Sequence, residues 1–277
     1  MNRPDAAFLQ EALRLATQAA LEAGEIALGY FRPGAQTSAD VQFKEGGSPV
    51  TEADLAVDRM LKGRLGAFDP AIGWLSEETE DDPARLDKAL VWVVDPIDGT
   101  RSFAQGRPDW GVAIGLLAAG RPVLGVLHVP AEGKTYTAHQ GGGAFLNGAA
   151  ITISGQTVVR GARLSGQQAM LDAVEKGAGT IARLPRIHSL AYRLALVADG
   201  TADGGLSSKN PHDWDLAAVH AVINEAGGTL KQIDGTDLHY NRASTRHPSV
   251  LAGHPLLVAG LSAILNGDNP TGRIRDD

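Results

Sequence analysis

The sequence predicts a mixed α/β protein, of the α+β / α/β class, in which two subdomains share one interface. Helix-like segments open the chain, and β-rich runs punctuated by glycine follow over residues 112–154. Beyond that point, helix-like segments alternate with short strands, which is typical of an α/β unit. We therefore expect an N-terminal α+β subdomain with an antiparallel sheet (residues 1–155) and a C-terminal α/β subdomain on a smaller sheet (residues 156–277).

Two helices and two strands are expected at the start of the chain. Apolar residues recur every three or four positions over residues 5–31, which predicts a long amphipathic helix. A second helix is expected to begin near Thr51, capped by Thr51 or Ser48. Short apolar runs predict strands at residues 73–75 and 90–94.

Hairpins and then alternating elements are expected in the rest of the chain. Turns at Gly120, Gly133 and Asn147-Gly148 separate the β-rich runs, which favours antiparallel hairpins. The run of three glycines at 141–143 is interpreted as another hairpin turn, because no helix or lysine follows it. The expected later elements are helices at 189–198 and 215–226 and strands near 202–206, 229–231 and 250–252.

Composition and charge exclude several classes of function. The 277 residues carry a formal net charge of -7, whereas non-specific nucleic-acid binding needs a basic surface. The absence of cysteine excludes disulfides and thiolate sites and fits a reducing compartment. No window is apolar enough to span a membrane, and the N-terminus does not resemble a signal peptide. We expect a cytoplasmic protein, and a phosphorylated small molecule remains compatible with the charge because a bound cation reverses the local field.

Acidic residues stand beside turns or element ends at four places. Their side chains should emerge where clefts form in α/β folds. Oxygen ligands without histidine or cysteine partners favour a hard cation, Mg²⁺ or Mn²⁺. The four places are Asp54 in SPVTEAD, Glu77 and Glu78 in WLSEET, Asp95 and Asp98 in DPIDGT, and Asp213 and Asp215 in DWDLAA.

The DPIDGT segment carries the most chemistry. Pro96 restricts the backbone between Asp95 and Asp98, so both carboxylates and the Ile97 carbonyl can converge on one cation. Gly99-Thr100 would start a helix whose free N–H groups suit a phosphate oxygen.

Each acidic place also has a structural interpretation when taken alone. The DPIDGT segment could be a capped turn, and Glu77 and Glu78 could be first-turn acids of a helix. Asp215 could cap the helix that follows it, and Asp54 could lie on a solvated helix face. Because these interpretations must hold independently at all four places, the combination favours a metal site.

The segments PVTEAD, SEET, WVVDPIDGTRSF and WDLAAVHAVINEAGG together resemble the signature segments of the inositol monophosphatase superfamily, in order and at suitable spacing. The resemblance covers residues 10–255 and implies an αβαβα layered sandwich of the sugar phosphatase type. It also implies a Mg²⁺-dependent, lithium-sensitive phosphatase that binds two or three ions, with Mn²⁺ as a substitute, and forms a homodimer.

The same resemblance assigns roles to individual residues. Metal would be bound by Glu77, Asp95, Asp98, Asp215 and the Ile97 carbonyl. Asp54, Thr100 and Glu77 would be catalytic, Asp54 and Thr100 by orienting and deprotonating the attacking water, and the Gly99 and Thr100 amides would hold the phosphate. Direct in-line attack by metal-activated water is the natural mechanism, since metal ions can polarise the phosphate and neutralise the leaving oxygen.

The substrate is expected to be a bisphosphate. Inositol-directed members carry a carboxylate seven residues before the last metal aspartate, where this chain has Ser208 followed by Lys209. Nucleotidase members carry a basic residue in the segment where this chain has Arg193. Arg193 and Lys209 could grip a second phosphate, although either could be an ordinary surface cation. We favour a 3'(2'),5'-bisphosphate nucleotidase, with inositol-1-phosphate and histidinol-phosphate hydrolysis as alternatives.

Two further residues complete the expected substrate-binding set. Ser189 begins the helix that carries Arg193, and His212 lies close to Asp215. The other histidines, His188 among them, show no paired metal-ligand spacing and are interpreted as structural. A catalytically silent regulatory or binding protein of the same fold is the alternative of another class.

Overall fold

The computed structural model describes residues 4–43, 49–208 and 210–267. A seven-stranded sheet runs in the order β3-β4-β5-β6-β7-β8-β9, and a five-stranded sheet in the order β11-β10-β12-β14-β13. The helices are α1 (Ala6–Tyr30), α2 (Glu52–Gly66), α3 (Thr100–Ala104), α4 (Gln168–Ala178), α5 (Leu190–Ala198), α6 (Asp213–Glu225) and α7 (Pro255–Leu265), with short 3₁₀ helices at Pro83–Asp87 and Pro130–Glu132.

The strands confirm the expected hairpins. In the large sheet β3 and β4 are parallel, and each later neighbour pairs antiparallel. Its strands are β3 (Gly73–Ser76), β4 (Leu90–Asp98), β5 (Gly111–Ala118), β6 (Arg121–Val129), β7 (Lys134–His139), β8 (Gly143–Leu146) and β9 (Ala149–Ile151). The other strands are β1 (Val41–Phe43), β2 (Pro49–Thr51), β10 (Arg163–Ser165), β11 (Ala182–Arg183), β12 (Gly204–Ser207), β13 (Thr229–Gln232) and β14 (Val250–Gly253).

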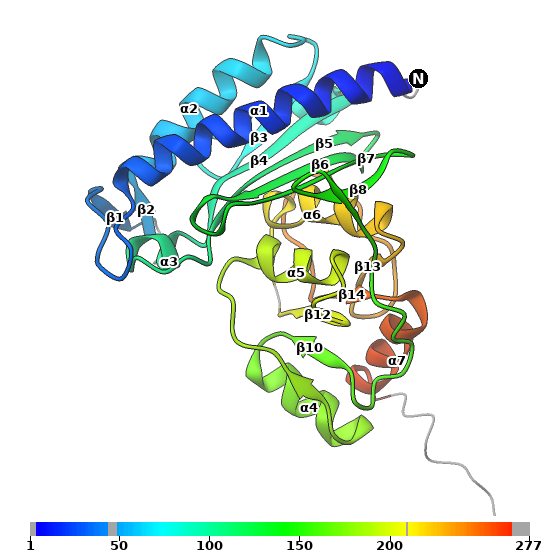
Figure 1. The fold of residues 1–277 in the computed structure, drawn as a ribbon. Helices are drawn as coiled ribbons and strands as arrows, with labels where there is room; N and C mark the ends of the chain where they lie inside the picture. The colour runs from blue at the N-terminus through cyan, green and yellow to red at the C-terminus, as the bar shows by residue number, and fades with distance from the viewer. Residues whose placement is uncertain (1–3, 44–48, 209, 268–277) are drawn as a thin grey trace, which may run out of the picture.

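The elements stack in five layers, as the family resemblance implies (Figure 1). Helices α1 and α2 cover one face of the large sheet, and α5 and α6 lie between the two sheets. Helices α4 and α7 pack together on the outer face of the small sheet. The predicted αβαβα architecture is therefore confirmed.

Helix α6 sits unusually close to the large sheet, which matters because it carries Asp215. Gly115 of β5 and Gly125 of β6 pair directly on these neighbouring strands. A Cβ atom at Gly125 would lie 2.0 Å from the Ala218 carbonyl oxygen, and one at Gly115 would lie 2.9 Å from the Ala217 Cβ. The two glycines thus let the α6 backbone rest on the sheet and set its height above β4.

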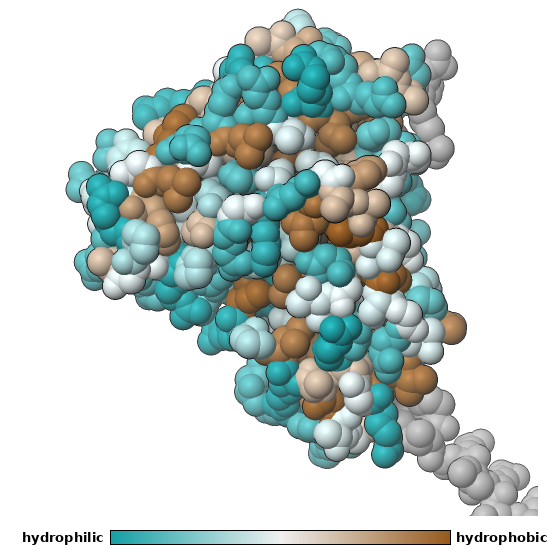
Figure 2. All heavy atoms as spheres, viewed as in Figure 1, coloured by the Kyte–Doolittle hydropathy of each residue, from teal (hydrophilic) through white to brown (hydrophobic). Residues whose placement is uncertain are grey.

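The surface mixes polar and apolar residues on the face shown in Figure 2. The exposed large apolar side chains come from separate elements, for example Leu21 on α1, Leu55 on α2 and Leu256 on α7. Among the described residues, no helix combines the length and the apolar character needed to cross a bilayer.

Acidification is expected to destabilise the fold through His220. Burial lowers the pKa of this α6 imidazole to about 4, and its Nδ1 lies 2.9 Å from the Tyr240 hydroxyl. Because the folded pKa lies below the ordinary value, the unfolded chain binds the extra proton first. The free energy of unfolding should therefore fall between about pH 6.5 and 4, by up to about 3 kcal/mol.

Urea unfolding of wild type and His220→Gln across this pH range measures the effect. Glutamine does not titrate, so the gap between the two curves should close on acidification, whereas exposed His239→Gln should track wild type. Parallel curves for wild type and His220→Gln would contradict the assignment.

Candidate functional site

Strand β4 carries Asp95 and Asp98 on the same face because it contains a bulge. The sequence places both residues after the strand, but the strand continues to Asp98. Asp95 pairs with Ala113 and Asp98 with Gly111, so β4 has one extra residue in between. Residues three apart would otherwise face opposite sides of the sheet. Pro96 lies at this irregularity, where a missing N–H is tolerated.

Asp98 is anchored to the start of α5. Its carboxylate accepts hydrogen bonds from the Ser189 hydroxyl at 2.6 Å and from the backbone N–H groups of Leu190 at 3.2 Å and Ala191 at 2.6 Å. Ser189 was expected to contact substrate; it is fully buried and positions Asp98 instead. The two halves of the chain are thus joined at a candidate metal ligand.

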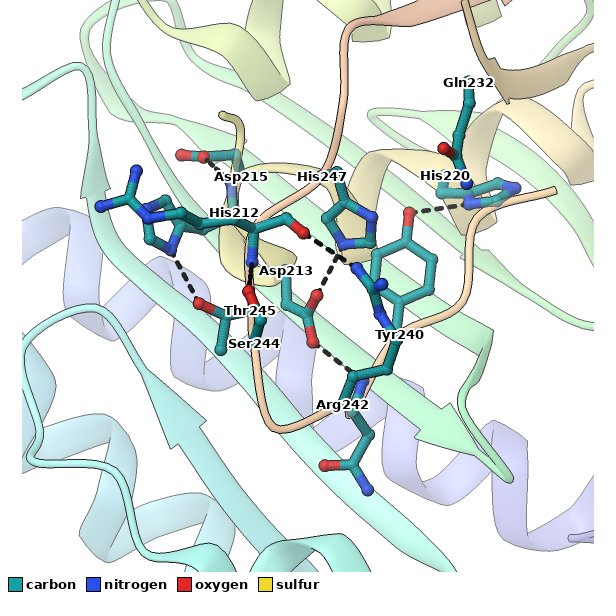
Figure 3. Close-up of polar contacts among 12 residues, drawn as sticks. His212, Asp213, Asp215, His220, Gln232, Tyr240, Arg242, Ser244, Thr245 and His247 are labelled. Atoms are coloured by element: carbon teal, nitrogen blue, oxygen red, sulfur yellow. Dashed lines mark hydrogen bonds and ion pairs between the residues drawn. The ribbon is translucent and has the colours of Figure 1, made fainter. Parts of the chain in front are cut away.

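Asp215 reaches the same place from α6, since its carboxylate oxygen lies within 4.8 Å of those of Asp95 and Asp98. Figure 3 shows Asp215 beside His212 at the start of this helix. The helix begins at Asp213 with His212 as its N-cap, so Asp215 is not the cap that its position suggested. Instead the Asp215 carboxylate accepts the His212 backbone N–H at 2.5 Å. His212 itself stacks on Trp214, with ring centroids 4.4 Å apart, and its Nδ1 lies 2.8 Å from the Thr245 hydroxyl.

Three aspartates form a cluster of close carboxylates that a bound cation would stabilise. Oxygens of Asp95, Asp98 and Asp215 all lie within 4.8 Å of one another. Burial and mutual repulsion hold the pKa of Asp95 and of Asp215 well above the usual range, and burial raises the pKa of Asp98 to about 6. Asp95 Oδ2 is buried without a hydrogen-bond partner among the described residues. Convergent carboxylates with an unsatisfied oxygen fit a hard divalent cation.

Glu77 lies near this cluster, in the loop after β3. Its charge raises the pKa of Asp54, Asp95, Asp98 and Asp215, and its backbone N–H donates to the Val94 carbonyl. The loop is held by Asp58, a residue that the sequence analysis missed. The Asp58 carboxylate, 6% exposed, accepts the hydroxyls of Ser76 at 2.5 Å and Thr79 at 2.6 Å. Its spacing of one helical turn from Asp54 was the available signal.

Asp54 and Thr100 lie beside each other, as the resemblance implies. Asp54 is 1% exposed, and its Oδ2 accepts the Thr51 hydroxyl at 2.5 Å and the Thr51 N–H at 2.8 Å in a capping box. Its Oδ1 lies 3.3 Å from the Thr100 hydroxyl, which also lies 3.1 Å from the Ile97 carbonyl oxygen. Burial raises the pKa of Asp54 to about 6, with Glu77 adding to the shift and the Thr51 bonds opposing it.

Gly99 and Thr100 form the turn into α3. Gly99 has a φ of 97°, a left-handed conformation that favours glycine. A Cβ atom there would approach the Asp109 carbonyl oxygen to 3.0 Å and the Ser189 Cβ to 3.2 Å. This residue therefore lets the start of α3 pack against the start of α5 directly below the carboxylate cluster.

A cavity of about 630 Å³ adjoins the cluster. Leu190, whose N–H binds Asp98, lies on its wall together with Ser208, Arg186 and Arg193. Arg193 is 6% exposed, its Nε has no partner among the described residues, and its charge couples to Asp98 and Asp215. His212 does not line this cavity.

One predicted substrate residue and a second cavity lie apart from this arrangement. Lys209 lies outside the described residues, so its predicted contact with a second phosphate stays a prediction. A larger cavity of about 930 Å³ lies between the start of α1, the β5–β6 turn and β13, and its lining includes none of the predicted site residues.

A buried, hydrogen-bonded aspartate–histidine pair supports the base of α6 behind Asp215 (Figure 3). Asp213 and His247 are both 0% exposed at their side chains, and Asp213 Oδ1 lies 2.6 Å from His247 Nε2. Asp213 Oδ2 accepts the Asn241 N–H at 2.9 Å, and the Asp213 N–H donates to the Thr245 carbonyl at 2.9 Å. The sequence singled out Asp213 but offered no sign of His247, which lies 34 residues away.

Breaking this pair is expected to destabilise the protein without additivity. Asp213→Ala and His247→Ala should each lower the free energy of unfolding by about 3 kcal/mol, because each leaves a buried polar partner unpaired. The double variant should lose less than the sum, with a coupling of about 1–3 kcal/mol. Urea unfolding of the four proteins measures the cycle, and strict additivity would show that the pair does not act as a unit.

Sequence comparisons relate the chain to known proteins. Residues 9–265 match the sequence model of the inositol monophosphatase family. A histidinol-phosphatase of Chlorobaculum parvum is 35% identical over 226 residues, covering 78% of this chain and 83% of that protein. The 3'(2'),5'-bisphosphate nucleotidase CysQ of Aggregatibacter actinomycetemcomitans is 33% identical, covering 89% and 92%. An inositol-1-monophosphatase of Mesorhizobium japonicum is 31% identical, covering 90% and 94%.

Solved structures show the same fold. The extragenic suppressor protein suhB of Bartonella henselae superimposes with a TM-score of 0.80 at 26% identity, covering 95% of this chain and 100% of that one. The three relatives named above carry three different substrate names at similar identity, so the identities do not select a substrate.

Proposed function

The chain belongs to the inositol monophosphatase family of phosphoric monoester hydrolases, and we propose that it is a Mg²⁺-dependent 3'(2'),5'-bisphosphate nucleotidase. Its reaction would convert adenosine 3',5'-bisphosphate to AMP and phosphate. The observation that carries the substrate is Arg193, a buried arginine that lines the cavity beside the acidic cluster and has no carboxylate partner among the described residues.

The acidic cluster would hold two or three metal ions. Asp95, Asp98, Asp215, Glu77 and the Ile97 carbonyl are the proposed ligands, supported by the convergence of three carboxylates and the unsatisfied Asp95 Oδ2. Bound Mg²⁺, or Mn²⁺ in its place, supplies charge neutralisation at the phosphate and a lowered pKa for the attacking water.

The chain's own residues would then orient the reactants. The backbone amides of Gly99 and Thr100 hold the phosphate oxygens at the start of α3. The Thr100 hydroxyl, 3.3 Å from Asp54 Oδ1, orients the attacking water and passes its proton toward that carboxylate. The direct displacement needs no covalent intermediate on the protein.

The cavity favours a second anionic group on the substrate. Its described lining includes Arg183, Arg186 and Arg193 and no carboxylate. Arg183 is already paired with the carboxylates of Asp172 and Glu175, whereas the hydrogen bond described for the Arg193 guanidinium goes to an uncharged group, the Ile187 carbonyl. An inositol ring gains no carboxylate from Ser208, and the cationic amine of histidinol phosphate would meet like charges.

The remaining expectations rest on the family resemblance, for lithium and the dimer, and on composition and the pattern of elements, for the location and the two subdomains. We propose lithium inhibition, a homodimer and a cytoplasmic location, and we retain the division into residues 1–155 and 156–277. The α5–α6 layer between the sheets supports an extensive shared interface between these two units.

A phosphate-release panel with Mg²⁺ tests the substrate. We expect adenosine 3',5'-bisphosphate to exceed adenosine 3'-monophosphate, inositol-1-phosphate, histidinol phosphate and fructose-1,6-bisphosphate in kcat/KM. A kcat/KM that is tenfold or more higher for inositol-1-phosphate or histidinol phosphate would refute the nucleotidase assignment. A tenfold ratio corresponds to about 1.4 kcal/mol, roughly the contribution of one strong hydrogen bond. Release from none of the esters would favour a binding protein.

Arg193 should account for the preference between the two adenosine esters. Arg193→Gln is expected to lower kcat/KM for the bisphosphate by about 10–100-fold, the value of a charge-assisted hydrogen bond, and to leave the 3'-monophosphate nearly unchanged. Arg183→Gln, which alters a paired arginine of the same cavity, is the matched control. An equal loss on both esters would assign Arg193 to the fold instead.

A further inference from the structure

A histidine–aspartate pair stands at the junction between the phosphate turn and the cavity. Asp109, 6% exposed, precedes β5, and His188 precedes the start of α5. Asp109 Oδ2 accepts the His188 backbone N–H at 2.8 Å and lies 3.0 Å from His188 Nδ1. Asp109 Oδ1 also accepts the Arg107 Nε at 3.2 Å. The imidazole is therefore fixed in both position and orientation.

The contacts of Asp109 determine which ring nitrogen a ligand can use. A carboxylate beside Nδ1 favours the tautomer with the proton on that atom, which leaves Nε2 as a hydrogen-bond acceptor. The imidazole side chain is 26% exposed and lines the cavity of about 630 Å³. Nε2 is thus the nitrogen that can meet a bound molecule.

The pair is built around the phosphate turn. The Asp109 carbonyl oxygen and the Ser189 Cβ are the two atoms that a Cβ on Gly99 would approach most closely, and Ser189 follows His188 directly. The same Ser189 hydroxyl binds Asp98. His188 thus lines the cavity and is joined, through Asp109 and Ser189, to the backbone around Gly99.

The chemistry of the cavity selects what His188 would bind. Guanidinium groups only donate hydrogen bonds, so Arg186 and Arg193 suit an anion but cannot accept from a hydroxyl. With its proton on Nδ1, toward Asp109, the His188 ring offers Nε2 as that acceptor next to the phosphate turn. We propose that His188 is a specificity-determining residue that accepts a hydrogen bond from the hydroxyl neighbouring the phosphate ester, with Asp109 as its positioning residue. The proposal rests on the proposed phosphatase function and narrows its substrates to esters with such a hydroxyl.

A matched nucleotide pair tests this role. Adenosine 3',5'-bisphosphate has the neighbouring 2'-hydroxyl, and its 2'-deoxy counterpart lacks it. Wild type is expected to favour the former in kcat/KM by about tenfold, the value of one neutral hydrogen bond. His188→Ala should remove the preference by lowering only the ribonucleotide value, and His188→Gln, whose Oε1 can replace Nε2, should restore part of it.

Asp109→Asn separates positioning from contact. It should reduce the preference while leaving the deoxynucleotide rate and the Mg²⁺-induced rise in Tm unchanged, because neither depends on Nε2. Equal losses on both nucleotides, or a preference that survives His188→Ala, would overturn the proposal.

Failure of the nucleotidase assignment gives a different result. Wild type would then release phosphate from neither nucleotide. In that case the two esters to compare are inositol-1-phosphate and phenyl phosphate, because phenyl phosphate has no hydroxyl next to its ester. Selective loss on the hydroxylated ester in His188→Ala supports the proposal there as well, and equal rates in variant and wild type on both esters overturn it.

Discussion

Asp95→Asn is expected to lower kcat/KM by about 10³-fold or more while making the metal-free protein more stable. A loss of this size corresponds to several kcal/mol less charge stabilisation of the phosphate in the transition state. Asn keeps the Oδ1 acceptor for the Ile97 N–H, 3.1 Å away, and replaces the unpartnered Oδ2 with an amide that can donate to neighbouring carboxylates. Activity and stability therefore change in opposite directions.

The stability gain has a defined pH dependence. Burial and the charges of Glu77, Asp98, Asp215 and Asp54 raise the pKa of Asp95, so the folded state holds a proton more tightly than the unfolded chain. Its contribution to stability is present at low pH and is lost as pH rises through the folded pKa. Without metal, Asp95→Asn should raise Tm by about 2–4 °C at pH 8, which corresponds to a gain of about 1 kcal/mol in the free energy of unfolding. At pH 5 the rise in Tm should be small.

Added Mg²⁺ should reverse the order of the two proteins. Wild type gains stability as metal binds, by about 2.7 kcal/mol at a hundredfold excess over Kd, whereas Asp95→Asn should gain little. Thermal unfolding with and without Mg²⁺ measures this, and exposed Asp234→Asn serves as the control. A full Mg²⁺ response in Asp95→Asn would remove Asp95 from the ligand set.

The sequence predicted elements whose signals are local. Helix α1 and the start of α2 follow from apolar spacing and from the Thr51 cap, and glycine or asparagine marks the hairpin turns of the large sheet. The predicted end of β4, at residue 94, was wrong because Asp95, Pro96 and Asp98 resemble a turn when taken alone. Pairing with β5 and a bulge keep them in the strand.

The convergence of carboxylates was predictable where the acidic residues fall in contiguous motifs. The acidic residues of DPIDGT, SEET and DWDLAA could be named from sequence, and the structure brings Asp95, Asp98 and Asp215 together. Partners distant along the chain could not be named, because nothing local links Asp213 to His247 or Asp109 to His188. Ser189 was misassigned for a related reason: its hydroxyl caps α5 and binds Asp98, which lies 91 residues earlier.

Asp54 differs from the clustered aspartates in what holds it. Three aspartates of the cluster repel one another, whereas two hydrogen bonds from Thr51 fix Asp54 Oδ2 and leave Oδ1 toward Thr100. With a pKa raised to about 6, Asp54 is ionised at neutral pH yet basic enough to accept a proton. It is thus suited to proton transfer.

Asp54→Asn is therefore expected to lower kcat by about 10²–10⁴-fold with little change in KM, because the base is lost while the ligands and the phosphate turn remain. Its Mg²⁺-induced rise in Tm should equal that of wild type, and Thr100→Ala should also reduce turnover more than substrate binding.

Asp58→Asn, one turn along the same helix, is the contrasting variant because it loosens the loop that carries Glu77. It should raise the Mg²⁺ concentration needed for the half-maximal rate and leave the rate at saturating Mg²⁺ largely intact. Steady-state kinetics over a range of Mg²⁺ concentrations distinguish the two effects, and a loss in Asp54→Asn that excess Mg²⁺ restores would make Asp54 a metal ligand and not the base.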